Sequence, residues 1–273
     1  MAADPARPTH AKDDGGCVEV VQVTDCHLFA DLEGRLAGVQ TDASLRAVLE
    51  HIDRHAEPDL LLLTGDLSQD ETEPSYHRLL SHLKGRAPEM LWLPGNHDAP
   101  ELMRRLGTLA LNRVDLTLGR WRILTLNSHW AGHTEGRLAE TELARLDAQL
   151  QAEPDLPTLV AVHHPPVPIG TPWLDAQRIV NGDALMECLG RFDQVRMLLC
   201  GHVHQAFSAT HGGFRLMTSP STCAQFAPHS DRFSLDTLGP GYRRLLLYPD
   251  GSHHTEVVRV SGDFSIHYDA DGY

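Results

Sequence analysis

Five short polar clusters in this chain each follow an apolar run. They comprise Asp25 with His27, Asp66, then Asn96, His97 and Asp98, then His163 with His164, and finally His202 with His204. Carboxylate, imidazole and amide groups suit hard or borderline cations, whereas closed structural zinc sites commonly use thiolates. The set is too large for one tetrahedral ion. The sequence therefore predicts a site for two metal ions that share a bridging carboxylate.

The clusters need structural elements that bring them together. Apolar runs predict strands at 18–24, 60–63, 90–93, 123–126, 159–162 and 197–200, and helical spacing predicts helices at 43–56, 75–84, 99–106, 140–150 and 183–190. Such alternation is typical of a parallel α/β sheet, in which ligands collect at the carboxyl ends of the strands. After residue 206 the pattern favours two hairpins, over 206–218 and 242–260. Periodicity alone therefore predicts a largely parallel α/β core with an antiparallel end.

Composition limits the classes of protein. The chain has 273 residues, 41% of them hydrophobic, which suffices for one large α/β domain or two smaller ones. No linker is evident, so we expect a single domain over 17–265, preceded by a disordered leader (1–16) and followed by a tail (266–273). A formal charge of −14 argues against binding to nucleic acid or to an anionic membrane.

Cysteine usage and hydropathy bear on the compartment. The cysteines are odd in number and scattered, with no C-x-x-C pair, which favours a reducing environment over a disulfide framework. No run approaches the roughly 18 apolar residues of a membrane-spanning helix. The leader has no apolar segment like that of a signal peptide. We therefore expect a cytoplasmic protein.

Taken in order, the clusters D-x-H, G-D, G-N-H-D, H and G-H-x-H resemble the signature of the calcineurin-like metallophosphoesterase superfamily. The resemblance implies a four-layer αββα sandwich of two mixed β-sheets flanked by helices. It implies that one metal is bound by Asp25, His27 and His204, the other by Asn96, His163 and His202, and that Asp66 bridges them. It also implies two catalytic residues that are not ligands: His97 faces the leaving-group oxygen, and Asp98 orients His97.

Longer segments that include the clusters and lie between and after them narrow the resemblance. Several ranges are similar to the bacterial class III 3′,5′-cyclic-nucleotide phosphodiesterases, the cyclic AMP phosphodiesterases of the CpdA type: 24–29, 38–41, 92–98, 173–175, 199–205, 220–226, 235–237 and 240–243. This implies hydrolysis of 3′,5′-cyclic AMP to 5′-AMP by a metal-bridging hydroxide, with His97 assisting departure of the leaving group. The implied substrate-binding residues are His27, Asn96, His97 and His204.

The resemblance further implies two divalent or trivalent ions, with iron, manganese and zinc as the candidates. The implied partner is a small cyclic nucleotide, with no nucleic acid or membrane involved, and the chain is expected to be a monomer or a homodimer. Two alternatives stay open: a metallophosphoesterase of broader specificity, acting on 2′,3′-cyclic nucleotides, other diesters or monoesters, and a catalytically silent metal-dependent binding protein. Also open is whether His164 and the 221–235 segment contact the substrate or only pack.

Overall fold

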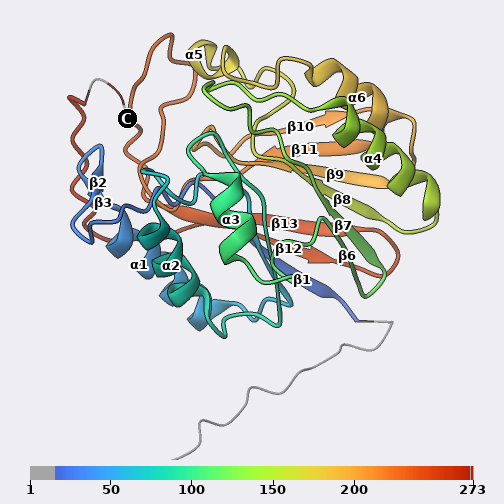
Figure 1. The fold of residues 1–273 in the computed structure, drawn as a ribbon, viewed down its shortest axis with the longest axis horizontal. Coiled ribbons are helices and arrows are strands. Elements are labelled where there is room, and N and C mark those ends of the chain that lie inside the picture. Colours follow the sequence, from blue (N-terminus) through green and yellow to red (C-terminus); the bar gives the residue numbers. More distant parts are fainter. Residues whose placement is uncertain (1–15, 271, 273) are drawn as a thin grey trace, which may run out of the picture.

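Two β-sheets face each other, and helices cover their outer sides (Figure 1). The computed structural model describes residues 16–270 and 272, so the predicted leader falls, apart from Gly16, outside the described residues. Helices α1 (Thr41–His55), α2 (Glu73–Leu83) and α3 (Pro100–Leu106) pack on the first sheet, and α4 (Glu140–Ala152) and α6 (Gly182–Gly190) on the second. The layers are therefore helix, sheet, sheet, helix.

The first sheet combines parallel and antiparallel strands. Its order is β13-β12-β1-β4-β5, and these strands span His253–Arg259, Gly241–Leu247, Val18–Val23, Leu60–Leu63 and Glu89–Trp92. Strands β1, β4 and β5 run parallel, with Val20 opposite Leu60, whereas β12 pairs antiparallel with β1. The predicted hairpin at the end of the chain thus forms one edge of this sheet.

The second sheet has the same mixed character. Its order is β10-β11-β9-β8-β7-β6, and these strands span Ser208–His211, Phe214–Thr218, Val195–Cys200, Thr158–Ala161, Trp121–Thr125 and Asp115–Leu118. The four strands β7, β8, β9 and β11 are parallel, and β6 and β10 pair antiparallel at the edges. A two-stranded ribbon, β2 (Arg35–Leu36) with β3 (Val39–Gln40), and the short helix α5 (Pro172–Asp175) complete the described elements.

The hydrophobic core shows why the strands are continuous apolar runs. In β4, Leu60 and Leu62 face the second sheet, while Leu61 and Leu63 face the helices on the opposite side. Successive strand side chains point to opposite faces, so a strand covered on both sides needs apolar residues at every position. Helix α1 buries Leu45 and Leu49 against the same sheet, as its helical spacing predicts.

The sequence located the main elements to within a few residues but did not show how the strands are grouped. Periodicity predicted a largely parallel core with an antiparallel end; the antiparallel end is confirmed by the pairing of β12 with β13, but the parallel strands are divided between two mixed sheets. The four-layer αββα sandwich implied by the family resemblance is confirmed. Strand β6, the β2–β3 ribbon and α5 had not been predicted, because they are short and carry little periodicity.

The end of the described chain packs on the ribbon. Ile266 contacts the buried cluster that contains Leu36 and Val39, and the His267 backbone N–H donates to Ala37 O at 2.9 Å. Within the described residues, no helix is both long and apolar enough to cross a bilayer.

Trp121 offers a test of the core between the sheets. Its side chain is 0% exposed, and its indole N–H donates to Tyr248 O at 2.8 Å. We expect Trp121→Ala to lower the free energy of unfolding by about 3–5 kcal/mol, because it removes the largest buried side chain of this layer. Chemical denaturation measures the loss.

Leu109→Ala serves as the control, since Leu109 is 92% exposed. It should change the free energy of unfolding by less than about 0.5 kcal/mol. If Trp121→Ala were as mild as this control, the packing described between the sheets would be wrong.

Candidate metal centre

The polar clusters meet where the two sheets bring their strand ends together. Asp25 and Asp66 follow β1 and β4 of the first sheet, and Asn96 follows β5 beside them. His163 and His202 follow β8 and β9, which are neighbours in the second sheet. Parallel strands place their carboxyl ends along one edge, which is why segments far apart in the sequence converge here.

Six of the predicted ligands form a tight, buried group. Asp25, His27, Asp66, His163, His202 and His204 are all 0% exposed. His163 Nε2 lies 3.1 Å from Asp66 Oδ2, and His204 Nε2 lies 3.4 Å from Asp25 Oδ1. Among the described residues, several overlapping sets have ligand atoms within 4.8 Å of one another: Asp25, His27 and His204; Asp25, Asp66 and His163; His27, Asp66 and His97; and His163, His164 and His202.

The imidazole nitrogens that face inward are arranged to bind a cation. His27 Nδ1 lies 2.6 Å from Gln69 Oε1, and His204 Nδ1 lies 2.7 Å from Ala224 O. Because these oxygens only accept, each Nδ1 carries the proton and each Nε2 presents a lone pair. The two Nε2 atoms are 3.1 Å apart. Burial lowers the pKa of His27 to about 3, so a proton does not bridge them, but a metal ion would.

Buried polar atoms that lack a hydrogen-bond partner point the same way. Within the described chain, they include Asn96 Oδ1 and both ring nitrogens of His202, while Asp66 Oδ2 and His163 Nε2 face each other at 3.1 Å without a well-aligned hydrogen bond. Leaving such an atom unsatisfied costs about 1–3 kcal/mol. Asn96 therefore adds an amide oxygen to the carboxylate and imidazole groups that could bind a metal. The residues present therefore fit a dinuclear metal site.

Asp66 lies at the centre of the group. Its Oδ1 accepts a hydrogen bond from the His97 backbone N–H at 2.9 Å, while Oδ2 faces His163 and, at 4.0 Å, His27 Nε2. Burial alone would raise the pKa of Asp66, but the nearby His163 and His97 hold it well below its usual range. The charge of Asp66 in turn raises the pKa of His163 to about 9, although burial opposes this. A metal ion and a proton therefore compete for that nitrogen.

The backbone of the ligand-bearing turns is strained. Asp25, His27, Asp66, His202 and His204 have φ of 54°, 48°, 50°, 69° and 48°. Non-glycine residues rarely adopt this left-handed conformation, which costs on the order of 1 kcal/mol or more for each and clusters at functional sites. Val203 N–H donates to Gly201 O at 2.8 Å, forming the tight turn that sends His202 and His204 to different groups.

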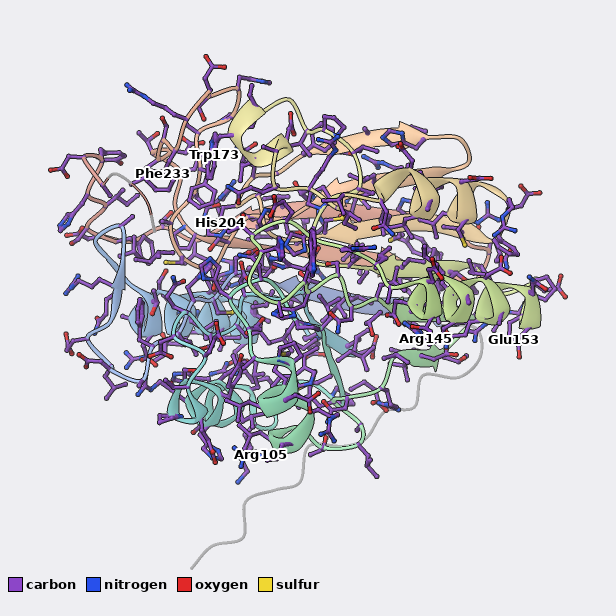
Figure 2. All side chains as sticks on the ribbon, turned by 45° about the horizontal axis from the view of Figure 1, so that its top comes forward. Arg105, Arg145, Glu153, Trp173, His204 and Phe233 are labelled. Atoms are coloured by element: carbon purple, nitrogen blue, oxygen red, sulfur yellow. The ribbon has the colours of Figure 1, made fainter. Side chains whose placement is uncertain are left out.

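An aromatic cluster packs against the His204 ring. The Phe226 ring stacks on the His204 imidazole, with centroids 4.1 Å apart and an interplanar angle of 9°. Trp173 and Phe233 pack edge-on against Phe226 at 5.1 and 5.5 Å, and Figure 2 shows both on the same side of the molecule as His204. Sequence reasoning missed this support, because a phenylalanine in a loop carries no signal of its partner.

Asp98 ties two turns together. Its carboxylate accepts hydrogen bonds from the backbone N–H groups of Leu67, Ser68 and Gly95 and, at 3.0 Å, from the Tyr76 hydroxyl. Burial, followed by the charge of Asp66, raises the pKa of Asp98 to about 6. These bonds fix the turn that carries Asn96 and His97. The orienting contact with His97 implied by the resemblance stays a prediction.

His164 lies beside the cluster and uses both of its nitrogens elsewhere. Its Nδ1 accepts from the Ser128 hydroxyl at 2.8 Å, and its Nε2 donates to Thr134 O at 3.1 Å. The ring packs against His202 with centroids 4.6 Å apart. Of the two alternatives that the sequence left open, this geometry favours packing over contact with the substrate.

Gly95 allows the two central turns to approach, and its replacement tests the geometry. A Cβ at this position would lie 2.1 Å from Asp66 Oδ1 and 2.5 Å from Asp66 N. We expect Gly95→Ala to displace Asp66, to lower the free energy of unfolding by about 1–3 kcal/mol and to remove most of the bound metal. Thermal unfolding and elemental analysis after dialysis measure both effects.

Gly213→Ala is the matched control, since a Cβ there meets no atom within 4 Å. It should keep the metal content of the unchanged protein. A Gly95→Ala variant that also retained its metal would contradict the described contact between Gly95 and Asp66.

Comparison with known proteins gives a consistent result. The chain is 40% identical to the 3′,5′-cyclic adenosine monophosphate phosphodiesterase CpdA of Vibrio vulnificus, over 94% of this chain and 95% of the relative. It is 41% identical to the protein of the same name from Escherichia coli, over 89% and 90%. Among solved structures, a dimetal phosphatase from Danio rerio aligns with a TM-score of 0.63 at 14% identity, covering 89% of this chain and 99% of that one.

The family assignment rests on the sequence identity to these two relatives and on a match to a family model. The similarity to the solved structure shows only the fold, because the two sequences are just 14% identical. The model of the calcineurin-like phosphoesterases matches residues 18–206, which contain every predicted ligand. The order of the clusters and their convergence on one buried site agree with that match. The chain therefore belongs to the calcineurin-like phosphoesterase family.

Proposed function

We propose that this protein is a dinuclear-metal phosphodiesterase that hydrolyses 3′,5′-cyclic AMP to 5′-AMP. The observation that carries the proposed substrate is the 40% identity, along almost the whole chain, to a relative named for this activity. The buried His and Asp groups support the proposed reaction class, because they fit two metal ions. An exposed acidic surface alone would not attract a phosphodiester, so the positive charge must come from bound metal.

We assign the ligands as the resemblance implies. Asp25, His27 and His204 would hold one ion, Asn96, His163 and His202 would hold the other, and Asp66 would bridge them. The groupings of neighbouring ligand atoms support this division, since His204 groups with Asp25 and His27, and His202 with His163. Iron, manganese and zinc all suit such nitrogen and oxygen ligands, and we propose one of these metals for each site.

The roles of the chain's own residues follow from where they lie. When bound, a metal pair lowers the pKa of a coordinated water and polarises the phosphoryl oxygens. His97 is half buried, and its ring lies edge-on to His27 with centroids 5.2 Å apart, so we place it at the leaving-group oxygen, to which it donates a proton. His27, Asn96 and His204 line the phosphodiester site. Asp98 holds the turn that carries Asn96 and His97.

The cellular setting stays a proposal. Cys26, Cys188, Cys200 and Cys223 are free, buried thiols, which supports a reducing compartment such as the cytoplasm. We propose a small-molecule partner, the cyclic nucleotide, with no role for nucleic acid or a membrane. We further propose a monomeric or homodimeric state, which light scattering after gel filtration would test.

A substrate panel tests the proposed specificity. With metal supplied, we expect kcat/KM for 3′,5′-cyclic AMP to exceed the values for 2′,3′-cyclic AMP and p-nitrophenyl phosphate by roughly tenfold or more, the ratio that one or two substrate contacts provide. Comparable values for all three would favour the alternative of a broad-specificity metallophosphoesterase. Elemental analysis of the same preparation identifies the metals.

His97→Ala separates catalysis from metal binding. We expect turnover to fall about 10²–10⁴-fold, because a positioned proton donor is lost, while the metal content remains close to two ions. His77→Ala is the control, since His77 lies exposed on α2. Unchanged turnover in His97→Ala would remove His97 from the mechanism. Lost metal would show that His97 is a ligand, as its place in the group with His27 and Asp66 also allows.

A further inference from the structure

A pocket of about 300 Å³ lies beside the candidate metal centre. Asn96 and Asp98 contribute to its lining, so it adjoins the site proposed for the phosphodiester. Glu71 lines it as well, and so does Pro100, the first residue of α3. The remaining lining residues are Ala99 and five residues, among them His129, of the segment 129–134, here named the 129–134 loop.

The 129–134 loop is tied to the metal-site framework at both ends. Ser128 and Thr134 bind the two ring nitrogens of His164, which immediately follows the proposed ligand His163. Gly136 packs closely on the same ring, where a Cβ would lie 2.6 Å from His164 Cγ. His164 thus acts as a positioning residue that fixes this loop relative to the metal ligands.

Contacts within the segment keep the loop ordered. The Trp130 and His133 rings stack with centroids 3.5 Å apart and an interplanar angle of 4°, and the Arg137 guanidinium lies 5.5 Å from the Trp130 ring. The backbone N–H of Arg137 also donates to Ser128 O at 2.9 Å, which closes the base of the loop. A pocket wall that is ordered before binding loses little entropy when a ligand arrives.

The chemistry of the pocket suits a neutral, planar group with polar edges. His129 is half buried, and burial lowers its pKa, so its imidazole is neutral near pH 7 and offers one donor and one acceptor. Glu71 adds a carboxylate acceptor, while Ala99, Pro100 and Ala131 add apolar surface. The Glu71 charge disfavours a second phosphate here. These are the features of a site for a nucleoside base rather than for the next phosphate of a polynucleotide.

The 221–235 segment is the other candidate for contact with the nucleoside, but its first residues pack inside the protein. Residues 221–226 are all buried, and Phe226 lies against His204. Gln225 donates to Ser221 O at 2.9 Å, and Ser221 donates to Asp25 O at 2.7 Å. These bonds support the metal ligands and leave the exposed residues near Arg232 as the part of this segment that remains accessible.

We propose that the pocket between Glu71 and the 129–134 loop binds the nucleoside half of the cyclic nucleotide, with His129 as a substrate-binding residue. This rests on the proposed function, because the phosphodiester is taken to lie on the metals beside Asn96. Specificity for a nucleoside diester is thereby separated from the reaction centre: the metal ligands act on the phosphodiester, and the 129–134 loop selects what is attached to it.

The experiment compares two diesters on the metal-loaded enzyme: 3′,5′-cyclic AMP and bis(p-nitrophenyl) phosphate, which has no nucleoside. In His129→Ala we expect KM for cyclic AMP to rise about tenfold, as for one lost hydrogen bond, with kcat/KM for the nitrophenyl diester within about twofold. Ala131→Trp, which fills the pocket from an exposed position, should give the same split. His254→Ala, exposed on β13, is the matched control and should change neither substrate.

Adenosine binding to metal-free protein, followed by saturation-transfer NMR, gives a second readout without turnover. Weaker binding in both pocket variants supports the proposal. Two results would overturn the proposal. One is an equal loss of kcat/KM for both diesters in the pocket variants; the other is a selective rise in KM for cyclic AMP in Arg232→Ala but not in His129→Ala. Failure of the proposed function is a separate result, because the unchanged protein would then not hydrolyse cyclic AMP at all.

Discussion

The arrangement of the site depends on one buried carboxylate. Asp66 is 0% exposed and faces His163 at 3.1 Å, while its other oxygen accepts the backbone N–H of His97. An isolated charge at such depth is prohibitively costly, so it requires a compensating cation and fixed partners. The β4 turn that carries Asp66 meets the β5 turn at Gly95, so this carboxylate also lies where the two turns approach each other most closely.

The rest of the fold makes that costly arrangement stable. Left-handed backbone at Asp25, Asp66 and His204 is unfavourable for each residue alone, and it persists because the surrounding structure over-determines it. Asp98 ties neighbouring turns together through backbone N–H groups, and Phe226 fixes the plane of the His204 ring. Two sheets with a shared apolar core supply the rigidity, since their strands are buried on both faces. The framework thus fixes the positions of the proposed ligand side chains.

This rigidity agrees with the proposal that the metal ligands act on the phosphodiester while the 129–134 loop binds the nucleoside. Ligands at strand ends move little, and they suit the part of a substrate that every phosphodiester shares. The 129–134 loop is joined to the second sheet through His164, which holds it in place relative to the proposed ligands. Recognition on a loop that a rigid scaffold positions is a common solution in enzymes.

The sequence alone indicated the candidate ligands, the order of the main elements and the family, because Asp25, Asp66, His163 and the Gly-His-Val-His cluster each follow a strand and are local patterns. It could not show that the strands separate into two sheets, since a strand buried by helices reads the same as one buried by another sheet. Nor could it show that Phe226 supports His204, or that His164 anchors the 129–134 loop. These are contacts between distant segments, and only tertiary structure decides them, because no local pattern specifies a long-range partner.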